Sequence, residues 1–83
     1  ISDAQKQAAL KRLSEEGGLD TVNGHEVIEL DTLDGYKHLT KDNGWLLVRP
    51  SGTEPVLRVY SEADTPEAAK ALVQDARAQL DVG

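Results

Sequence analysis

A short polar segment between two apolar runs carries the residues of this chain that are best suited to chemistry. It reads Arg49-Pro50-Ser51-Gly52-Thr53-Glu54-Pro55 and separates the apolar residues 45–48 from residues 56–60. A guanidinium, two hydroxyl groups and a glycine lie close together in it, so it can donate several hydrogen bonds to one anion. It holds no group suited to breaking a covalent bond. The segment therefore predicts a phosphate-binding loop and not a reaction centre.

Each residue type in this loop has a physical role to offer. Arg49 stays charged at physiological pH, and its planar fork matches two phosphate oxygens at once. Ser51 and Thr53 supply hydroxyl donors. Gly52 has no Cβ, so its backbone can take a positive φ and approach a ligand closely. The same residue types are also common in tight turns between antiparallel strands, so spacing alone leaves a purely structural turn open.

Two further charged residues are candidates for supporting roles. Arg58 lies in the apolar run after the loop and is the second cation that could reach a phosphate. Glu54 would repel a bound phosphate, so we expect it to structure the loop. If the Glu54 carboxylate faces inward, a pair with Arg58 is the sensible arrangement.

The sequence predicts no catalytic residue and no metal site. His25 and His38 are isolated, and we expect them on the surface or at a sheet edge. The acidic residues do not form a cluster tight enough to supply converging oxygen ligands. Turn and capping roles are expected for three of them: Asp31, Asp34 and Asp64.

Composition narrows the class of protein. The 83 residues carry nine basic and fifteen acidic side chains, a net charge of −6, which argues against a nucleic-acid partner. No cysteine is present, and no apolar run approaches the roughly 20 residues that cross a bilayer. Without a signal-peptide pattern, a cytoplasmic protein with no membrane partner is expected. The chain opens at Ile1 and lacks methionine, so we expect a piece excised from a longer protein.

Two amphipathic segments predict helices near the ends of the chain. Ser2 and Gln5 suggest a capping box, and the first helix should end at two glycines, Gly17 and Gly18. Its apolar stripe is loose: Ala4, Ala8, Leu10 and Leu13. The second helix should be capped by Thr65, with Pro66 in its first turn. Its apolar stripe is regular: Ala69, Leu72, Val73, Ala76 and Leu80.

Strands are predicted for residues 27–30, 36–40, 45–49 and 56–62, with a hairpin turn at residues 42–44. Leu46 and Val48 should share one face of their strand, with Trp45 and Leu47 on the other. We expect Trp45 and Tyr60 to be core or sheet-face residues. The fold class is α+β: residues 1–83 form one domain, a small antiparallel sheet of about four strands with two helices on one face.

The same residues resemble a known family. The loop at residues 49–55 with the following residues 56–63, and residues 34–37 and 44–49 before it, are similar to the C-terminal domain of the α-D-phosphohexomutases. The bacterial phosphoglucomutase/phosphomannomutase branch is the most similar. The resemblance implies a TBP-like fold. It also implies that the substrate phosphate, on the side facing away from the catalytic phosphoserine, is held by Arg49, Ser51, Gly52 and Thr53.

The resemblance further implies a four-domain parent enzyme that moves phosphate between C1 and C6 of glucose or mannose phosphate through a bisphosphate intermediate. The phosphoserine, the aspartate-rich magnesium site and the sugar-recognition loop belong to other domains of such a parent. This chain would then bind no cofactor itself, would be inactive alone, and would have the phosphosugar and the other domains as partners. Two alternatives stay open: a phosphoglucosamine mutase C-terminal domain, and a stand-alone anion-binding or interaction module.

Overall fold

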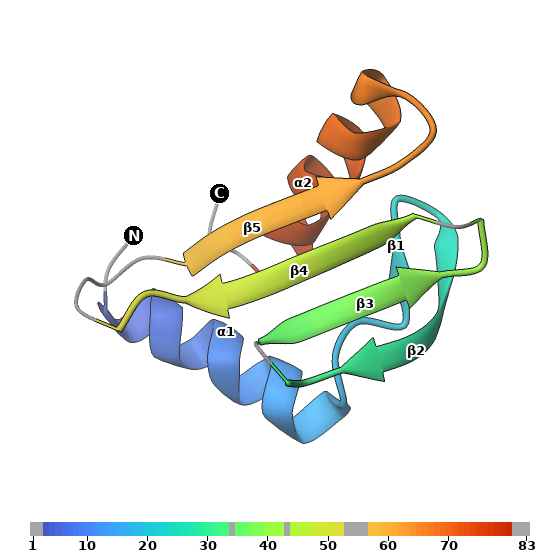
Figure 1. Cartoon of the computed structure of the whole chain (residues 1–83). Coiled ribbons are helices and arrows are strands. Elements are labelled where there is room, and N and C mark those ends of the chain that lie inside the picture. The colour runs from blue at the N-terminus through green and yellow to red at the C-terminus, as the bar shows by residue number, and fades with distance from the viewer. Residues whose placement is uncertain (1–2, 34, 43, 53–56, 81–83) are drawn as a thin grey trace.

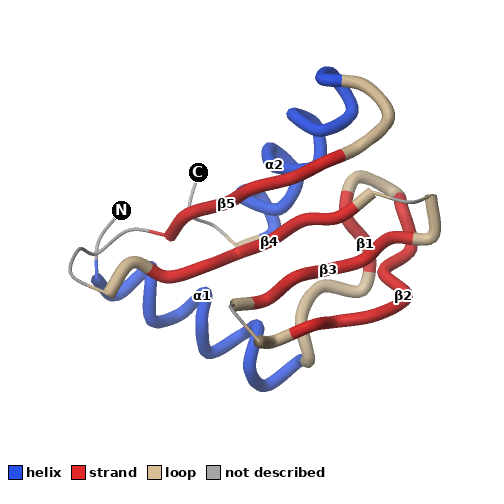
Figure 2. Tube along the Cα trace, viewed as in Figure 1, coloured by secondary structure: helices blue, strands red, loops and turns tan. Residues whose placement is uncertain are grey.

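Two helices and a five-stranded sheet make up the chain in a computed structural model that describes residues 3–33, 35–42, 44–52 and 57–80. Figure 1 shows both helices on the same side of the sheet, and Figure 2 shows the strands running as one antiparallel meander in the order β1-β2-β3-β4-β5. In chain order the elements are α1 (Asp3–Glu16), β1 (Thr21–Val22), β2 (His25–Asp31), β3 (Tyr36–Thr40), β4 (Trp45–Pro50), β5 (Leu57–Glu62) and α2 (Pro66–Gln79).

The predicted α+β class is confirmed, and the strand count rises from about four to five. The additional strand is β1, which pairs with the start of β2 across Asn23 and Gly24. Both turn residues have positive φ, at 50° and 79°, as tight hairpin turns with this residue pair require. The Asn-Gly signal was present in the sequence and would have predicted this hairpin. Because of it, β2 begins at His25, before the predicted residue 27.

Helix α1 ends where the sequence predicted. Gly17 and Gly18 have φ of 72° and 93°, and the Gly18 N–H donates to the Leu13 carbonyl at 2.9 Å. This bond satisfies a carbonyl that the last helical turn leaves without an intrahelical partner. Ser2, the predicted cap at the other end of α1, lies outside the described residues.

The buried face of α1 differs from the predicted stripe. Ala9 and Leu13 are buried, whereas Ala4 and Ala8 are exposed. The partly buried Lys6 lies one turn before Ala9 on the same face. The alkyl part of the Lys6 side chain thus takes the place of an apolar residue on the inner face of α1. A stripe drawn from apolar residues alone therefore missed part of this face.

Helix α2 begins where the sequence predicted and buries the predicted face. The Thr65 side chain accepts from the Ala68 N–H at 3.1 Å, which is the predicted N-cap. Leu72, Ala76 and Leu80 are buried. Neither helix, over the part of the chain that the structure describes, combines the length and apolarity needed to cross a bilayer.

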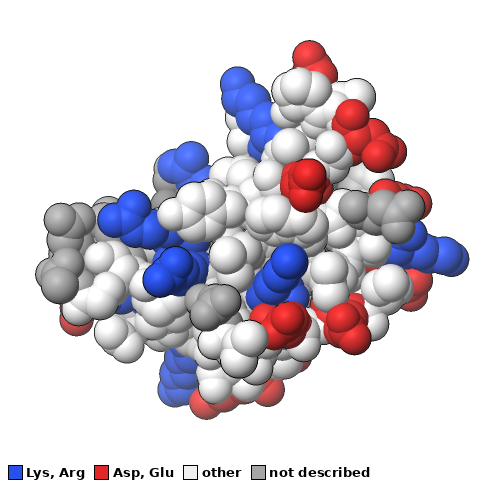
Figure 3. Space-filling view, viewed as in Figure 1, with Lys and Arg blue, Asp and Glu red and all other residues white. Residues whose placement is uncertain are grey.

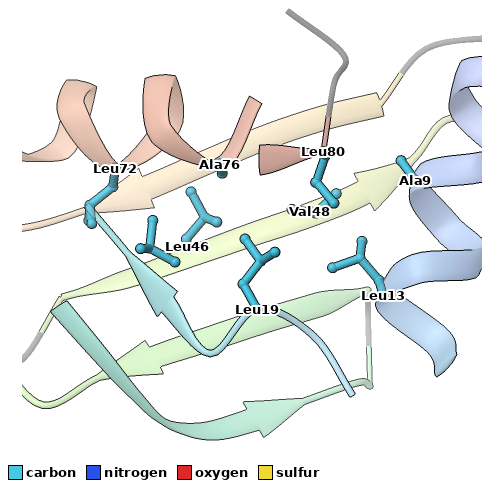
Figure 4. Packing of buried hydrophobic residues seen from close by; sticks show 9 residues of the cluster. Ala9, Leu13, Leu19, Leu46, Val48, Leu72, Ala76 and Leu80 are labelled. Atoms are coloured by element: carbon cyan, nitrogen blue, oxygen red, sulfur yellow. The ribbon is translucent and has the colours of Figure 1, made fainter. Parts of the chain in front are cut away.

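The core lies between the two helices and the inner face of the sheet, as Figure 4 shows. Leu46 and Val48 of β4 are fully buried there, and Trp45 and Leu47 are half-buried on the other face, as predicted. Residues from α1, β1, β4, α2 and the segments beside them complete the cluster: Ala9, Leu13, Leu19, Val22, Leu46, Val48, Leu72, Ala76 and Leu80.

The outer face of the sheet carries no helix in Figure 1 and is called the open face below. Trp45 lies half-buried on it: its indole N–H donates to a Glu62 carboxylate oxygen at 2.7 Å, and Lys37 Nζ lies 4.9 Å from the ring centroid. Tyr60 is 45% exposed on the neighbouring strand. Both aromatic residues are thus sheet-face residues, as predicted.

His38 is fully buried in the core, so the prediction of a surface or edge position was wrong for it. Its Nε2 accepts from the Leu19 N–H at 3.0 Å, and its Nδ1 lies 3.0 Å from the Tyr36 carbonyl and 3.2 Å from the Leu46 carbonyl. Carbonyls only accept, so these partners assign the proton to Nδ1 and leave the ring neutral. Both ring nitrogens are satisfied, and this explains how a polar side chain can occupy the core.

Stability should therefore fall in mild acid. Burial lowers the pKa of His38 below its ordinary 6.5, and the two backbone carbonyls oppose this only in part. The unfolded chain then takes up the proton first as the pH drops below 6.5, so stability present above 6.5 is lost towards the folded pKa. We expect a slope of up to about 1.4 kcal/mol per pH unit in urea denaturation followed by circular dichroism between pH 7.5 and 5.

Two variants separate His38 from other titrating groups in that experiment. His38→Gln should flatten the slope, whatever its effect on absolute stability. His25→Gln is the control, because His25 is partly exposed and lies outside the buried core, so the slope that His38 causes should persist in it. An unfolding free energy in the unchanged chain that does not vary between pH 7.5 and 5 would contradict the assignment.

Candidate functional site

Arg49 lies near the end of β4 and points to the open face. Its neighbour Val48 is fully buried, and the alternation along the strand turns the exposed Arg49 side chain away from the helices. β4 then leads through Pro50 into the candidate loop. The structure thus positions Arg49 with a packed strand, while its guanidinium remains accessible to a ligand.

The β4–β5 register brings the two predicted arginines together. Arg49 pairs directly with Arg58 across the strands, and both side chains are exposed. Directly opposed residues of antiparallel strands have Cβ atoms about 5 Å apart on one face. We call these two residues the arginine pair. The separation of the two residues along the sequence did not indicate this juxtaposition, which follows from the register alone.

No acidic partner neutralises the arginine pair within the described ranges. In those ranges Arg12 pairs with Glu16 and His25 is hydrogen-bonded to Asp42, and neither contact involves the arginine pair. Figure 3 shows Lys and Arg gathered towards the end of β4 and the start of β5, with most visible Asp and Glu lying towards the opposite end of the sheet. Like charges directly opposed across strands repel each other. An anion bound between the two guanidinium groups would relieve that repulsion.

Beyond the end of β4 at Pro50, the structure describes two residues of the loop, Ser51 and Gly52. Ser51 is 9% exposed, and its carbonyl accepts a hydrogen bond from Lys6 Nζ at 2.8 Å. Sequence reasoning missed Lys6, because the contact spans 45 positions and joins α1 to the end of β4. Thr53 and Glu54, predicted as a phosphate ligand and a supporting residue, lie outside the described residues, as does any Glu54–Arg58 pair.

Gly52 is exposed and has room around it. Its φ is not in the positive region, so the conformational reason given for a glycine here does not apply. Apart from its chain neighbours, no described residue has an atom within 4 Å of a Cβ built on Gly52. The space beside its Cα is therefore open, which preserves the second argument from sequence, the close approach of a ligand to the backbone.

Gly35, in the turn before β3, lies close against the β4 backbone at Val48 and Arg49. It has φ +145°, and a Cβ there would lie 2.7 Å from the Val48 carbonyl oxygen and 3.3 Å from the Arg49 Cα. Only a glycine allows this contact without moving β4. The sequence had placed Gly35 in the region of family resemblance without a structural role, and the structure supplies one.

Asp31 behaves as the ordinary turn residue that the sequence predicted. The Asp31 carboxylate accepts from the Leu33 N–H at 3.0 Å, the turn role predicted for it. Asp34 lies outside the described residues. Across the described ranges, no group of three or more His, Asp or Glu side chains is arranged to hold a metal ion.

Fold and surface together define a small α+β domain whose open sheet face ends in two exposed arginines. The chain belongs to the family described as phosphoglucomutase/phosphomannomutase, C-terminal domain, whose family model matches residues 2–79.

Individual relatives are similar over shorter stretches. A probable phosphoglucosamine mutase of Methanopyrus kandleri is 50% identical over 44 residues, which is 53% of this chain and 10% of that protein. A phosphoglucomutase/phosphomannomutase of Thermococcus kodakarensis is 52% identical over 42 residues, 51% of this chain and 9% of that protein. A phosphopentomutase of the same organism is 38% identical over 63 residues, 76% of this chain and 14% of that protein. The matches thus span only about a tenth of the length of these relatives.

Proposed function

We propose that this chain binds the phosphate group of a phosphosugar, as the C-terminal domain of a phosphohexomutase. The observation that carries the proposal is the arginine pair, which is exposed on the open face where β4 leads into the loop. Two guanidinium groups side by side offer a dianionic phosphate paired donors from both strands. Family membership supports the proposal, because relatives of this chain bear the names of phosphosugar mutases.

The proposed parent reaction is an intramolecular phosphotransfer between C1 and C6 of a hexose phosphate through a bisphosphate intermediate. The phosphate donor and magnesium would come from other domains of the parent, and this chain would grip the phosphate that is not reacting. A donor set that contacts only phosphate suits a sugar that binds in two orientations, because it ignores which carbon carries the group.

We propose glucose or mannose phosphate as the sugar, because residues 44–47 resemble the phosphoglucomutase/phosphomannomutase branch. Glucosamine phosphate is the second candidate. The second candidate is favoured by the name of the Methanopyrus kandleri relative. All three sugar phosphates present the same phosphate chemistry to the arginine pair, so the binding proposal is independent of this choice.

Titration of the chain with inorganic phosphate tests the binding proposal directly. Amide resonances of Ser51 and Gly52, and the side-chain Nε resonances of Arg49 and Arg58, should shift first and saturate together. Chloride at matched ionic strength is the control, because a screening effect would follow ionic strength and not phosphate. Shifts that instead map to α2, or that chloride reproduces, would exclude the proposed site.

A further inference from the structure

Lys6 makes a contact that neither the sequence pattern nor the proposed phosphate contacts explain. Its ammonium group donates to the Ser51 carbonyl oxygen at 2.8 Å, from a partly buried position on α1. Ala9 and Leu13, on the same face of the helix, are fixed in the core. The base of the Lys6 side chain is therefore held by packing, and its tip reaches the backbone of the candidate loop.

This contact constrains a neighbouring donor through the geometry of the peptide unit. In a planar trans peptide the carbonyl of one residue and the N–H of the next point in opposite directions. The Ser51 carbonyl points towards α1, which lies on the helix-covered side of the sheet (Figure 1). The Gly52 N–H is thereby directed away from α1. Gly52 is exposed, with open space beside its Cα.

We propose that Lys6 is a positioning residue for the phosphate loop: by holding the Ser51 carbonyl, it aims the Gly52 N–H at the bound phosphate. This inference rests on the proposed function, and it adds a residue from the opposite end of the chain to the site. Lys6 acts through the peptide unit and does not need to touch the ligand. Preorganising a donor in this way removes the cost of ordering it when the ligand binds.

Three variants measured in the same phosphate titration test the inference. Lys6→Met retains the packed alkyl stem and removes the donor. Lys6→Arg retains a donor of the same charge. Lys11→Met removes an equal charge from an exposed position on the same helix and is the matched control. The readouts are the phosphate dissociation constant, the phosphate-induced shift of the Gly52 amide proton at saturation, and the thermal midpoint by circular dichroism.

Lys6→Met should weaken phosphate binding about tenfold, the scale of one charge-assisted hydrogen bond, and should reduce the Gly52 shift while the other shifts persist. Lys6→Arg should restore both readouts, and Lys11→Met should leave them unchanged. If Lys6→Met fails to fold, Lys6→Gln, which retains a shorter donor, takes its place with the same expectations in weaker form.

Failure of the inference can be told apart from failure of the proposed function. If the unchanged chain binds phosphate at Gly52 and Lys6→Met binds it equally well, the positioning role is overturned and the site stands. If Lys6→Met and Lys11→Met weaken binding to the same extent, Lys6 contributes only net charge, and the inference is again overturned. If the unchanged chain shows no phosphate shift at Gly52, both proposals fall.

Discussion

In the proposed parent phosphohexomutase, replacing Arg49 by alanine should lower kcat/KM for the phosphosugar by roughly 30- to 1,000-fold. This corresponds to about 2–4 kcal/mol, the scale of removing one partner from a hydrogen-bonded charge pair. The loss should not come from unfolding. Arg49 is exposed and faces the like charge of Arg58, so its removal should leave the unfolding free energy unchanged or slightly higher.

Two companion variants define what Arg49 contributes. Arg49→Lys retains the charge and loses the planar fork, so it should recover only part of the activity. Lys37→Ala removes a cation from the same open face, where Lys37 lies over the Trp45 ring, and should leave kcat/KM within about twofold of the unchanged enzyme. An Arg49→Ala enzyme with unaltered kcat/KM would remove Arg49 from the site.

The second large effect concerns the turn after α1. Gly18→Ala should destabilise the chain by about 3 kcal/mol in urea denaturation. Part of this cost is backbone strain, since φ at Gly18 is +93°. The rest is overpacking, because the new Cβ would lie 2.9 Å from His38 Nε2 and 3.0 Å from Leu30 Cδ1. Relief of that contact would displace His38 and weaken its bond to the Leu19 N–H.

Gly17→Ala provides the matched control in the adjacent position. Gly17 also has a positive φ, of +72°, but a Cβ there would meet no atom within 4 Å. It should cost about 1 kcal/mol, the strain alone. An equal loss of unfolding free energy in the two variants would show that backbone strain accounts for the effect and that the contact of the new Cβ with His38 contributes nothing.

The elements of the fold could be predicted from the sequence wherever the signal is local. The cap at Thr65, the glycines after α1 and the alternation through β4 each depend on residues close together in the chain. The buried face of α1 was predicted only in part: Leu13 is buried, but Ala4 and Ala8 are exposed, because the partly buried Lys6 and Ala9 lie on the inner face instead. His38 was predicted wrongly because three backbone partners, two of them on other segments, make its burial possible.

For the candidate site, too, residue types indicated some features and the three-dimensional structure was needed for others. Residue chemistry led us to propose Arg49 and Ser51 as ligands of an anion, and these roles stay predictions. The opposition of Arg49 and Arg58 depends on strand register, and the Lys6 contact depends on how α1 packs against the end of β4. The first depends on how two neighbouring strands pair and the second spans 45 positions, so residue types alone did not show either contact. The roles of Thr53 and Glu54 remain predictions from sequence.

Trp45 is the single tryptophan of the chain, and it lies on the open face beside Lys37 and Glu62. The tryptophan fluorescence of this protein therefore originates from the outer surface of the sheet, with Lys37 over the ring and Glu62 at its N–H edge. Its emission reports whatever covers that surface, and it is a poor monitor of the interior, where no indole is present. Binding of a partner domain to the sheet would therefore change the tryptophan emission of the unlabelled protein.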